Sequence, residues 1–356
     1  MFKPSTRPVA ACLLGLAIAG CGLAPTTPLK SLGMSHVGAR SGGDYQLFVE
    51  PDQGVAPVIQ TINSARRSVD LVVYILSSPD VISALESAHS RGVQVRVLLE
   101  PKPYNPSNPN VPLPINKKTY SELKGAGISV QYTSPQFTFT HEKAMVVDNQ
   151  TAIIETANLS KAAFQNNREY GIVDRVAADV AETEAIFQAD WSHSAYTPND
   201  PNLVVSPDNS RQRLVDLIAS AQRSVVVQDE EMGDPAISQA LGARVRAGLS
   251  VRVQLARFKD GNTNAQEQQE LNSAGVTSVG FLAKPMLHAK LVVVDGQAAY
   301  VGSVNLSTNS MDHNRELGVI LRDKGIVSQL ASTADQDWGQ SQLPSSMIDL
   351  APSLPL

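Results

Sequence analysis

Two short stretches of the sequence carry the same set of reactive side chains. Each has a histidine, a lysine two residues later and an aspartate five residues beyond it: His141, Lys143 and Asp148, then His288, Lys290 and Asp295. Side chains two apart in an extended strand point to the same face, so each imidazole would lie beside its ammonium. An imidazole can attack as a nucleophile or move a proton, and an ammonium can hold a phosphate oxygen. The pattern therefore indicates phosphodiester chemistry.

Further polar residues follow the two motifs at matched distances. An asparagine comes 17 residues after each histidine and a glutamate 28 residues after it, which gives Asn158, Asn305, Glu169 and Glu316. The amides are neutral donors for phosphate oxygens, and the carboxylates are candidates to orient the imidazoles. If the two copies face each other, one imidazole can attack phosphorus while the other protonates the leaving oxygen. The two lysines would then stabilise the more negative transition state.

The motifs belong to a longer repeat. Residues 64–69 and 91–97 recur at 220–225 and 247–253 with an offset of 156, whereas the motifs and the later Asp-Trp pairs recur with an offset of 147. The first copy therefore carries nine extra residues, which we expect in the Pro- and Asn-rich stretch 101–118. A unit of this length indicates a duplicated domain. By chance, one such motif is expected in about one of a hundred chains of this composition, so two at matched positions are a strong signal.

Strands and helices alternate within each copy. Apolar or β-branched runs predict strands at 47–49, 69–76, 93–99, 203–205, 224–228 and 251–255. Helical spacing occurs at 55–65, 81–90, 214–221 and 237–246. We therefore expect an α/β fold: a duplicated α-β-α sandwich, with halves at 44–200 and 201–340 related by a pseudo-two-fold axis and sharing one active site.

Composition excludes several classes of protein. The chain has 356 residues, 42% hydrophobic and 18% charged, which favours a packed core over disorder. Its only cysteines, Cys12 and Cys21, lie near the N-terminus, so no disulfide framework or cysteine-based metal site is expected in the body of the protein. The net charge of −5 excludes a generally basic surface as the basis of nucleic-acid binding.

The N-terminal segment is predicted to be a targeting signal. Residues 1–21 combine two basic residues, an apolar run too short to span a bilayer, and small residues before Cys21. This ending resembles a bacterial lipobox, which implies cleavage before Cys21 and a lipid on its sulfur and amine, anchoring the protein to a membrane. Residues 22–43 read as a flexible tether and 341–356 as a Pro- and Ser-rich tail. Because Gly22 is not aspartate, we expect an exported lipoprotein of the outer membrane, at its periplasmic face or the cell surface.

With these motifs, residues 45–340 resemble the phospholipase D superfamily, known for a paired His-x-Lys-x4-Asp motif. The resemblance implies a two-step reaction through a phosphohistidine, without metal or other cofactor. It implies His141 as nucleophile and His288 as acid and then base, each oriented by Glu169 or Glu316. The remaining assignments cover phosphate binding by Lys143, Lys290, Asn158 and Asn305, with Ser303 and Thr156 supplying hydroxyls, and a structural role for Asp148 and Asp295.

One departure from the family pattern concerns the first copy. The second copy has the family's Gly302-Ser303, but the first has Glu155-Thr156 at the matching place. Threonine can replace the serine hydroxyl. Glu155 is harmless if it points outward; if it points inward, it opposes phosphate binding and its pKa rises.

Other residues allow two interpretations each. We expect residues 229–231, Asp-Glu-Glu, to be a solvated cluster, the alternative being recognition of a cationic lipid head group. His313 is expected in a solvated loop, the alternative being a pocket-lining role. Trp191 and Trp338 are expected to pack in the core. Residues 101–118 form either a lid over the site or a variable surface loop.

The sequence thus favours an enzyme acting on membrane phospholipids at a phosphodiester, either releasing phosphatidic acid or transferring the phosphatidyl group to an alcohol. A cardiolipin-synthase-like transferase is one alternative. A nuclease of the same superfamily is another, against which the net charge of −7 left after removal of residues 1–21 weighs. A non-catalytic surface protein is the third. Since one chain supplies both half-sites, a monomer suffices.

Overall fold

A computed structural model describes residues 43–257 and 263–341 of the chain. The predicted signal segment, Cys21, nearly all of the tether and nearly all of the tail lie outside the described residues. Residues 41–356 form one compact unit with its own hydrophobic cores, so this part of the chain can be studied on its own. Among the described helices, none combines the length and apolar character needed to cross a membrane.

The first half is built on a mixed sheet with the strand order β1-β7-β6-β5-β2-β3-β4. The strands β2, β3 and β4 are parallel, and the pairs among β1, β7, β6, β5 and β2 are antiparallel. Their bounds are β1 (Tyr45–Glu50), β2 (Ser68–Val73), β3 (Gln94–Leu99), β4 (Ser129–Tyr132), β5 (Lys143–Val147), β6 (Thr151–Glu155) and β7 (Asn167–Asp174).

The second half repeats this sheet with the order β8-β15-β14-β13-β9-β10-β11. Its strands are β8 (Leu203–Ser206), β9 (Ser224–Asp229), β10 (Ser250–Ala256), β11 (Val279–Leu282), β13 (Lys290–Val294), β14 (Ala298–Gly302) and β15 (Glu316–Leu321). A short additional strand, β12 (Met286–Leu287), leaves this sheet and pairs with β7 of the first half. The duplicated α/β fold predicted from the repeat is therefore confirmed.

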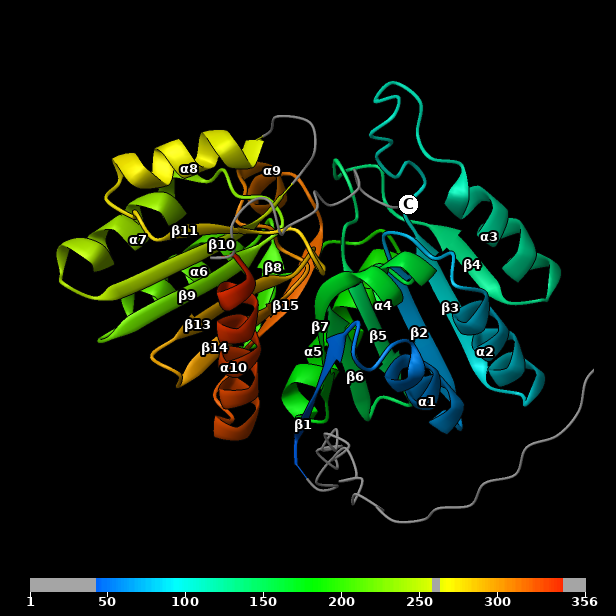
Figure 1. The fold of residues 1–356 in the computed structure, drawn as a ribbon. Helices are drawn as coiled ribbons and strands as arrows, with labels where there is room; N and C mark the ends of the chain where they lie inside the picture. The colour runs from blue at the N-terminus through cyan, green and yellow to red at the C-terminus, as the bar shows by residue number, and fades with distance from the viewer. Residues whose placement is uncertain (1–42, 258–262, 342–356) are drawn as a thin grey trace, which may run out of the picture. The chain divides into compact units, whose positions relative to one another are not determined.

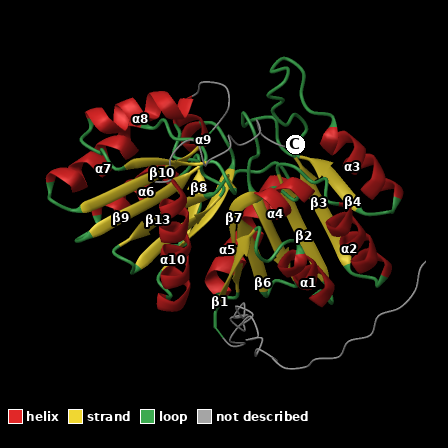
Figure 2. Cartoon of the chain, in the orientation of Figure 1, coloured by secondary structure: helices red, strands yellow, loops and turns green. Residues whose placement is uncertain are grey.

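Helices cover the outer faces of both sheets, as Figures 1 and 2 show. Apolar residues at helical spacing bury one face of each helix. The first sheet carries α1 (Ala56–Ser64), α2 (Pro79–Ser90), α3 (Ile115–Gly125) and α4 (Lys161–Asn166). The second carries α6 (Ser210–Ala219), α7 (Pro235–Arg246), α8 (Thr263–Ser273) and α9 (Thr308–Asp312). The remaining helices, α5 (Ala177–Trp191) and α10 (Lys324–Ser341), follow the last strand of their half.

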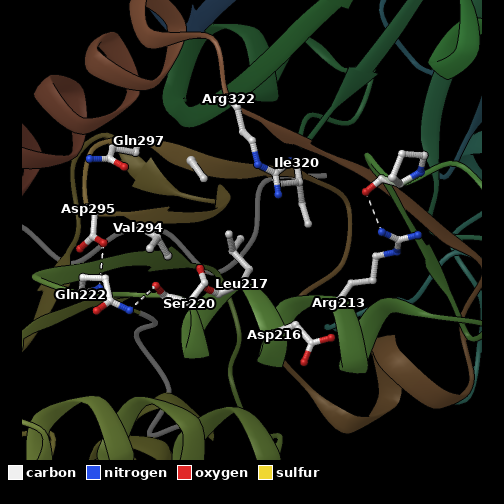
Figure 3. Close-up of a pocket in the computed structure, with 12 residues that line it drawn as sticks. Arg213, Asp216, Leu217, Ser220, Gln222, Val294, Asp295, Gln297, Ile320 and Arg322 are labelled. Atoms are coloured by element: carbon white, nitrogen blue, oxygen red, sulfur yellow. Dashed lines mark hydrogen bonds between the residues drawn. The ribbon is translucent and has the colours of Figure 1, made fainter.

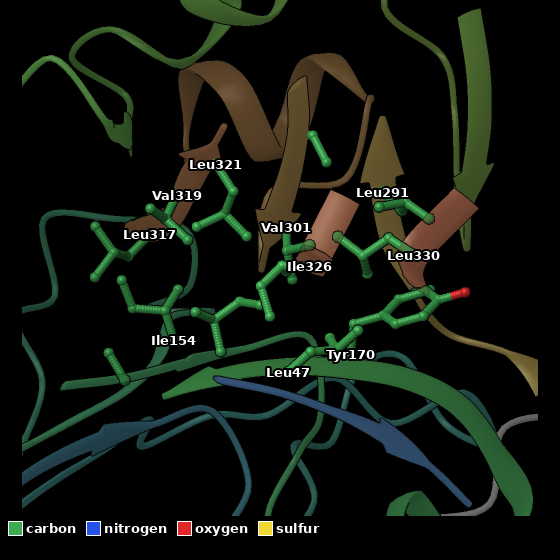
Figure 4. Packing of buried hydrophobic residues seen from close by; sticks show 14 of the residues in the cluster. Leu47, Ile154, Tyr170, Leu291, Val301, Leu317, Val319, Leu321, Ile326 and Leu330 are labelled. Carbon is green, nitrogen blue, oxygen red and sulfur yellow. The ribbon is translucent and has the colours of Figure 1, made fainter. Parts of the chain in front are cut away.

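The inner faces of the two sheets share one core. Alternate residues of strands from both halves meet there, including Leu47 and Ile154 of the first half and Val301 and Leu317 of the second. Figure 4 shows these side chains interlocking, together with residues of α10 such as Leu330. Apolar burial on this face holds the halves together and thereby fixes the two motifs relative to each other.

Two local predictions were refined by the structure. The strand predicted at 69–76 ends at Val73, because the chain beyond Tyr74 turns to a different partner, Leu159, whose amide donates to the Ile75 carbonyl. The nine extra residues do lie where they were expected. Fifteen residues separate β3 from α3, whereas six separate β10 from α8.

Candidate active site

Both motif histidines lie just before a strand rather than within one. Lys143 begins β5 and Lys290 begins β13, and each histidine precedes its lysine by two residues. A backbone hydrogen bond from the opposite half fixes each histidine: His141 N donates to the Arg315 carbonyl at 2.8 Å, and His288 N donates to the Arg168 carbonyl at 3.2 Å. Each half therefore positions the histidine of the other.

The histidine–glutamate pairs cross between the halves. Nδ1 of His141 lies 2.9 Å from Glu316 Oε2, and Nδ1 of His288 lies 2.8 Å from Glu169 Oε1 and 3.0 Å from Oε2. Both carboxylates are fully buried. Proximity to the facing imidazole and lysine outweighs burial and lowers the pKa of each glutamate. Glu169 and Glu316 therefore stay ionised, and each holds a ring orientation that leaves Nε2 as the reacting nitrogen.

A second crossed set of ion pairs lies beside the first. Arg168 donates through Nε to Asp337 at 2.8 Å, and Arg315 donates through Nε to Asp190 at 3.0 Å. All four groups are buried. In the sequence these aspartates stand out only as part of the repeated Asp-Trp pairs, which does not reveal their ion-pair role. Their recurrence at the motif offset, like that of the Arg-Glu pairs, was the signal that could have found them.

The two lysines have different surroundings. Lys143 Nζ donates to the His141 carbonyl at 2.6 Å and lies 5.3 Å from the centre of the Tyr74 ring. Burial lowers its pKa to about 7, with Glu316 opposing and Lys290 reinforcing the shift. Lys290 Nζ is 2.7 Å from Glu230 Oε2. Although burial lowers its pKa, Glu230 and Glu169 more than offset this, so the pKa of Lys290 is raised.

His141 is neutral at pH 7. Burial lowers its pKa from 6.5 to about 4; Lys143 reinforces the shift and Glu316 opposes it. The Tyr74 ring packs edge-on against the imidazole with centroids 4.5 Å apart. A neutral imidazole with Nδ1 held by a carboxylate is equipped to attack through Nε2.

The expectation of a solvated acidic cluster at 229–231 was wrong for two of its three members. Asp229 is fully buried and Glu230 is 7% exposed, whereas Glu231 is exposed. Asp229 is the last residue of β9 and lies opposite Lys290, the first residue of β13. The end of β9 that carries Asp229 and Glu230 therefore lies beside the second motif. Glu230 Oε2 also lies 3.2 Å from Nε2 of His288. Despite burial, His288 and Lys290 lower the pKa of Glu230 from 4.5 to about 2.

Glu230 makes the half-sites chemically different. At the place of Glu230 the first half has Tyr74, because β2 and β9 pair with the two motif strands in the same register. His288 is therefore flanked by carboxylates at both ring nitrogens. His141 has a carboxylate at one nitrogen and an aromatic edge beside the ring.

The motif aspartates hold a turn. Asp148 accepts hydrogen bonds from the backbone amides of residues 66–68, and Asp295 accepts the equivalent three from residues 222–224. These bonds lower the pKa of both carboxyls despite partial burial. Both residues adopt positive φ, 57° and 55°, at the far ends of β5 and β13 from the lysines. The structural role that the resemblance implies for both aspartates stays a prediction, which these hydrogen bonds support.

The remaining phosphate-binding candidates fall into two groups. Asn158 and Asn305 each have an Oδ1 that is buried without a hydrogen-bond partner. Thr156 Oγ1 donates to Glu169 at 2.6 Å, and Ser303 Oγ donates to the Leu317 carbonyl at 3.2 Å. Phosphate binding by these four residues stays a prediction. The two hydroxyls also brace the strands that carry Glu169 and Glu316.

Glu155 points inward, the second of the two outcomes considered. It is 4% exposed, and burial together with Glu169 and Glu50 raises its pKa well above 4.5. Glu50 pairs with Glu169 across β1 and β7, is fully buried, and has its pKa raised by burial to about 8. In the second half, Gly302 stands at the position of Glu155 and Ser206 at that of Glu50. A Cβ on Gly302 would lie 2.2 Å from the Gly318 Cα, so a side chain does not fit there. With its pKa at about 8, Glu50 is protonated at pH 7, and the raised pKa of Glu155 likewise favours its neutral form.

Several predicted features outside the motifs are clear in the structure. His313 is exposed and caps α9, as expected of a loop residue. Trp191 is partly buried and stacks on Phe187, and Arg96 lies over both rings. Trp338 is partly buried and carries Arg252 over its ring. The tryptophans therefore pack at the edge of the core.

A hollow of about 460 Å³ opens on the second half, away from the histidines. It lies at the Asp295 end of β13, opposite Lys290, and Figure 3 shows Arg213, Gln222 and Arg322 around it. Arg213 is already bonded to the carbonyls of residues 200 and 201. In the described part of the chain, no group of three or more histidine, cysteine, aspartate or glutamate residues is placed to hold a metal ion.

Comparison with known proteins agrees with this geometry. Residues 58–191 and again 214–338 match the family "Cardiolipin synthase, PLD-like domain". The chain is 25% identical over 351 residues to Cardiolipin synthase A of Erwinia tasmaniensis, covering 85% of this chain and 70% of that protein. It is 22% identical over 337 residues to a cardiolipin synthase of Clostridium perfringens, covering 81% and 68%.

Solved structures share the fold. Phosphatidylserine synthase of Haemophilus influenzae superposes with a TM-score of 0.64 at 12% identity, covering 84% of this chain and 86% of that one. Polyphosphate kinase of Porphyromonas gingivalis gives 0.64 at 13% identity, and the match spans 87% of this chain but only half of the kinase. Each of the two segments that match the family contains one motif histidine and the glutamate that pairs with the histidine of the other segment. The chain therefore belongs to the phospholipase D superfamily, as a protein with two cardiolipin-synthase-type PLD-like domains.

Proposed function

We propose that this protein transfers a phosphatidyl group from a membrane phospholipid to an alcohol, in the manner of a cardiolipin synthase. The observation that carries the proposal is the crossing of the histidine–glutamate pairs, in which the motif histidine of each half contacts a carboxylate of the other half. We infer from it that two imidazoles and two lysines act at one site. The two cardiolipin synthases reported above each match over more than four fifths of the chain. This supports transfer, an alternative in the sequence analysis, over simple hydrolysis.

In the first step, Nε2 of His141 attacks the phosphorus of the lipid phosphodiester. The bond from phosphorus to the head-group oxygen breaks, and His288 gives that oxygen a proton. Lys143 and Lys290 hold the phosphate oxygens as negative charge builds. The donor's phosphatidyl group is then bound to His141 through a phosphorus–nitrogen bond.

In the second step, neutral His288 takes a proton from an acceptor hydroxyl. The acceptor oxygen attacks phosphorus, the bond to His141 breaks, and both imidazoles return to their starting states. Water at the same position gives phosphatidic acid instead of a new diester. The product ratio therefore depends on which hydroxyl reaches His288.

The asymmetry of the half-sites supports this division of roles. His141 is neutral at pH 7, as a nucleophile must be. His288 has Glu169 at one nitrogen and Glu230 at the other, so a carboxylate lies within hydrogen-bond distance of each ring nitrogen. For phosphate to reach Lys290 and Nε2 of His288, the Glu230 carboxylate must give up its contacts with both.

We also propose that the protein is exported and anchored by a lipid on Cys21. The support is the lipobox-like ending of residues 1–21, and the anchor would hold the enzyme beside its substrate. Incorporation of a labelled fatty acid into the wild type but not into Cys21→Ser would support this. Equal labelling of both proteins would contradict it.

Product analysis by mass spectrometry tests the enzymatic proposal. Residues 41–356 are incubated in chelator with phosphatidylglycerol vesicles and, separately, with single-stranded DNA. Wild type is expected to form cardiolipin and free glycerol, with phosphatidic acid as the minor product. His141→Ala is expected to form neither lipid, whereas His313→Ala, which changes an exposed histidine, keeps full activity.

Other product patterns would refute the proposal in distinct ways. Phosphatidic acid without cardiolipin would make the protein a hydrolase. DNA cleavage with intact lipid would make it a nuclease. Lipid products that persist in His141→Ala would remove the assigned nucleophile.

A further inference from the structure

The segment 101–118, between β3 and α3, concentrates exposed apolar side chains. Of the large hydrophobic residues in the described part of the chain, Tyr104 is 47% exposed and Val111 is 53% exposed, and both belong to this segment. The corresponding connection in the second half is nine residues shorter. The segment is therefore a feature of the first half alone.

The same segment is basic in an acidic protein. From 101 to 121 the sequence has three lysines, Lys102, Lys117 and Lys118, and no aspartate or glutamate, whereas the chain as a whole carries −5. All three lysines are exposed. Across the described residues, none of the three takes part in an ion pair. The charge of Lys102 also acts on the neighbouring carboxylate of Glu100, whereas Lys117 and Lys118 present theirs to the solvent.

Internal hydrogen bonds give the segment a defined shape. The Asn105 side chain accepts from the amides of residues 107 and 108 and donates to the Val111 carbonyl at 2.9 Å. Leu113 is buried at its base in a small cluster with Tyr74. Tyr104 and Val111 are thus presented by an ordered loop.

The segment is connected directly to the site. The Tyr104 amide donates to Tyr74 Oη at 2.6 Å. Tyr74 in turn packs against His141, with ring centroids 4.5 Å apart, and lies under Lys143. Figure 1 shows the connection before α3 projecting beyond the body of the first half. Whatever binds this loop is therefore brought close to the nucleophile.

We propose that residues 101–118 dock the enzyme on the surface of an anionic lipid bilayer. Tyr104 and Val111 would enter the interfacial layer, where an amphipathic aromatic ring and a small apolar side chain are favourable. The three lysines would lie against anionic head groups. This inference rests on the proposed lipid substrate and adds how the bilayer is brought to the site, separately from any lipid on Cys21.

Vesicle co-sedimentation of residues 41–356, which lack Cys21, tests the docking. The vesicles contain equal parts of phosphatidylglycerol and phosphatidylcholine, or phosphatidylcholine alone. We expect binding to the anionic vesicles only, falling at least about tenfold in Tyr104→Ser/Val111→Ser. A similar fall is expected in Lys102→Ser/Lys117→Ser/Lys118→Ser, since each lysine near an anionic surface favours binding. The control Arg66→Ser/Lys324→Ser removes two exposed charges elsewhere and should bind like wild type.

Turnover of a monomeric short-chain phosphatidylglycerol separates this inference from the function proposed above. Both docking variants should keep wild-type turnover on this substrate while losing turnover on vesicles. If wild type binds vesicles through the segment but turns over neither lipid, the proposed function fails and the docking stands. If turnover is normal and the variants bind vesicles like wild type, the docking is refuted. Binding of single-stranded DNA that depends on the lysines but not on Tyr104 and Val111, without vesicle binding, would also refute it.

Discussion

Glu230→Gln is the substitution whose effect follows most directly from the geometry. The carboxylate lies 2.7 Å from Lys290 Nζ and 3.2 Å from Nε2 of His288, with its side chain 10% exposed. These partners lower the pKa of Glu230 from 4.5 to about 2. At about 1.4 kcal/mol for each tenfold change, the ionised carboxylate contributes about 3 kcal/mol to folding at pH 7.

The pH dependence of this contribution has a defined sign. Because the pKa of Glu230 is lower in the folded state, the stabilisation is present above pH 4.5 and disappears as the pH falls through about 2. Glu230→Gln should therefore lower the free energy of unfolding by about 3 kcal/mol at pH 7 and by only about 1 kcal/mol at pH 3.

Urea unfolding of residues 41–356 at both pH values measures the difference. Glu122→Gln, an exposed glutamate on α3 without an ion pair among the described residues, is the control and should change stability by less than about 0.5 kcal/mol. A loss for Glu230→Gln that is the same at pH 7 and pH 3 would refute the electrostatic account. So would no loss at either pH.

The remaining predictions concern the buried acids, the nucleophile and the crossed ion pairs. Burial raises the pKa of Glu50 to about 8, so above pH 4.5 the protein must take up a proton at this residue when it folds. Glu50→Gln removes this cost and should stabilise the protein against urea by about 3 kcal/mol at pH 7, while leaving its stability unchanged at pH 4. The pKa of His141 is lowered to about 4 and that of Lys143 to about 7, so kcat/KM should rise as the pH increases through about 4 and fall above about pH 7. A rise of kcat/KM centred at pH 6.5 instead would contradict the burial of the imidazole. Asp337→Asn removes the buried carboxylate that pairs with Arg168 and leaves only the exposed Asp52 at 3.6 Å, so it should cost about 3–5 kcal/mol by urea unfolding. Asp335→Asn, in an exposed pair on the same helix, should cost less than about 1 kcal/mol; equal losses would refute the distinction.

The sequence was enough to predict the duplicated fold and the identity of the motif residues. Repetition is readable because two copies of one folding unit keep the same apolar spacing and the same strand ends. The offset change from 156 to 147 even located the inserted loop. Strand limits were less certain, because β2 ends where the chain turns to pair with Leu159, a residue distant in the sequence.

The sequence alone could not predict that each motif histidine pairs with the glutamate of the other half. Spacing within one copy shows that His141 and Glu169 recur together, but not that the partner of His141 is Glu316. That choice depends on how the two inner sheet faces pack. The prediction that Glu230 is solvated failed for the same reason. A run of three acids is usually exposed, and it is the ion pair with Lys290, from a strand distant in the sequence, that compensates for burying the Glu230 carboxylate.

Trapping the covalent intermediate tests the central claim most directly. The substrate is a phosphatidyl ester of p-nitrophenol, whose leaving group departs without a proton, so His288→Ala should complete the first step and stall before the second. After an alkaline quench and proteolysis, peptide mass spectrometry should find the phosphatidyl adduct on His141. An adduct on another residue of His288→Ala, or one on His288 in His141→Ala, would contradict the assignment of His141 as nucleophile and His288 as acid and base.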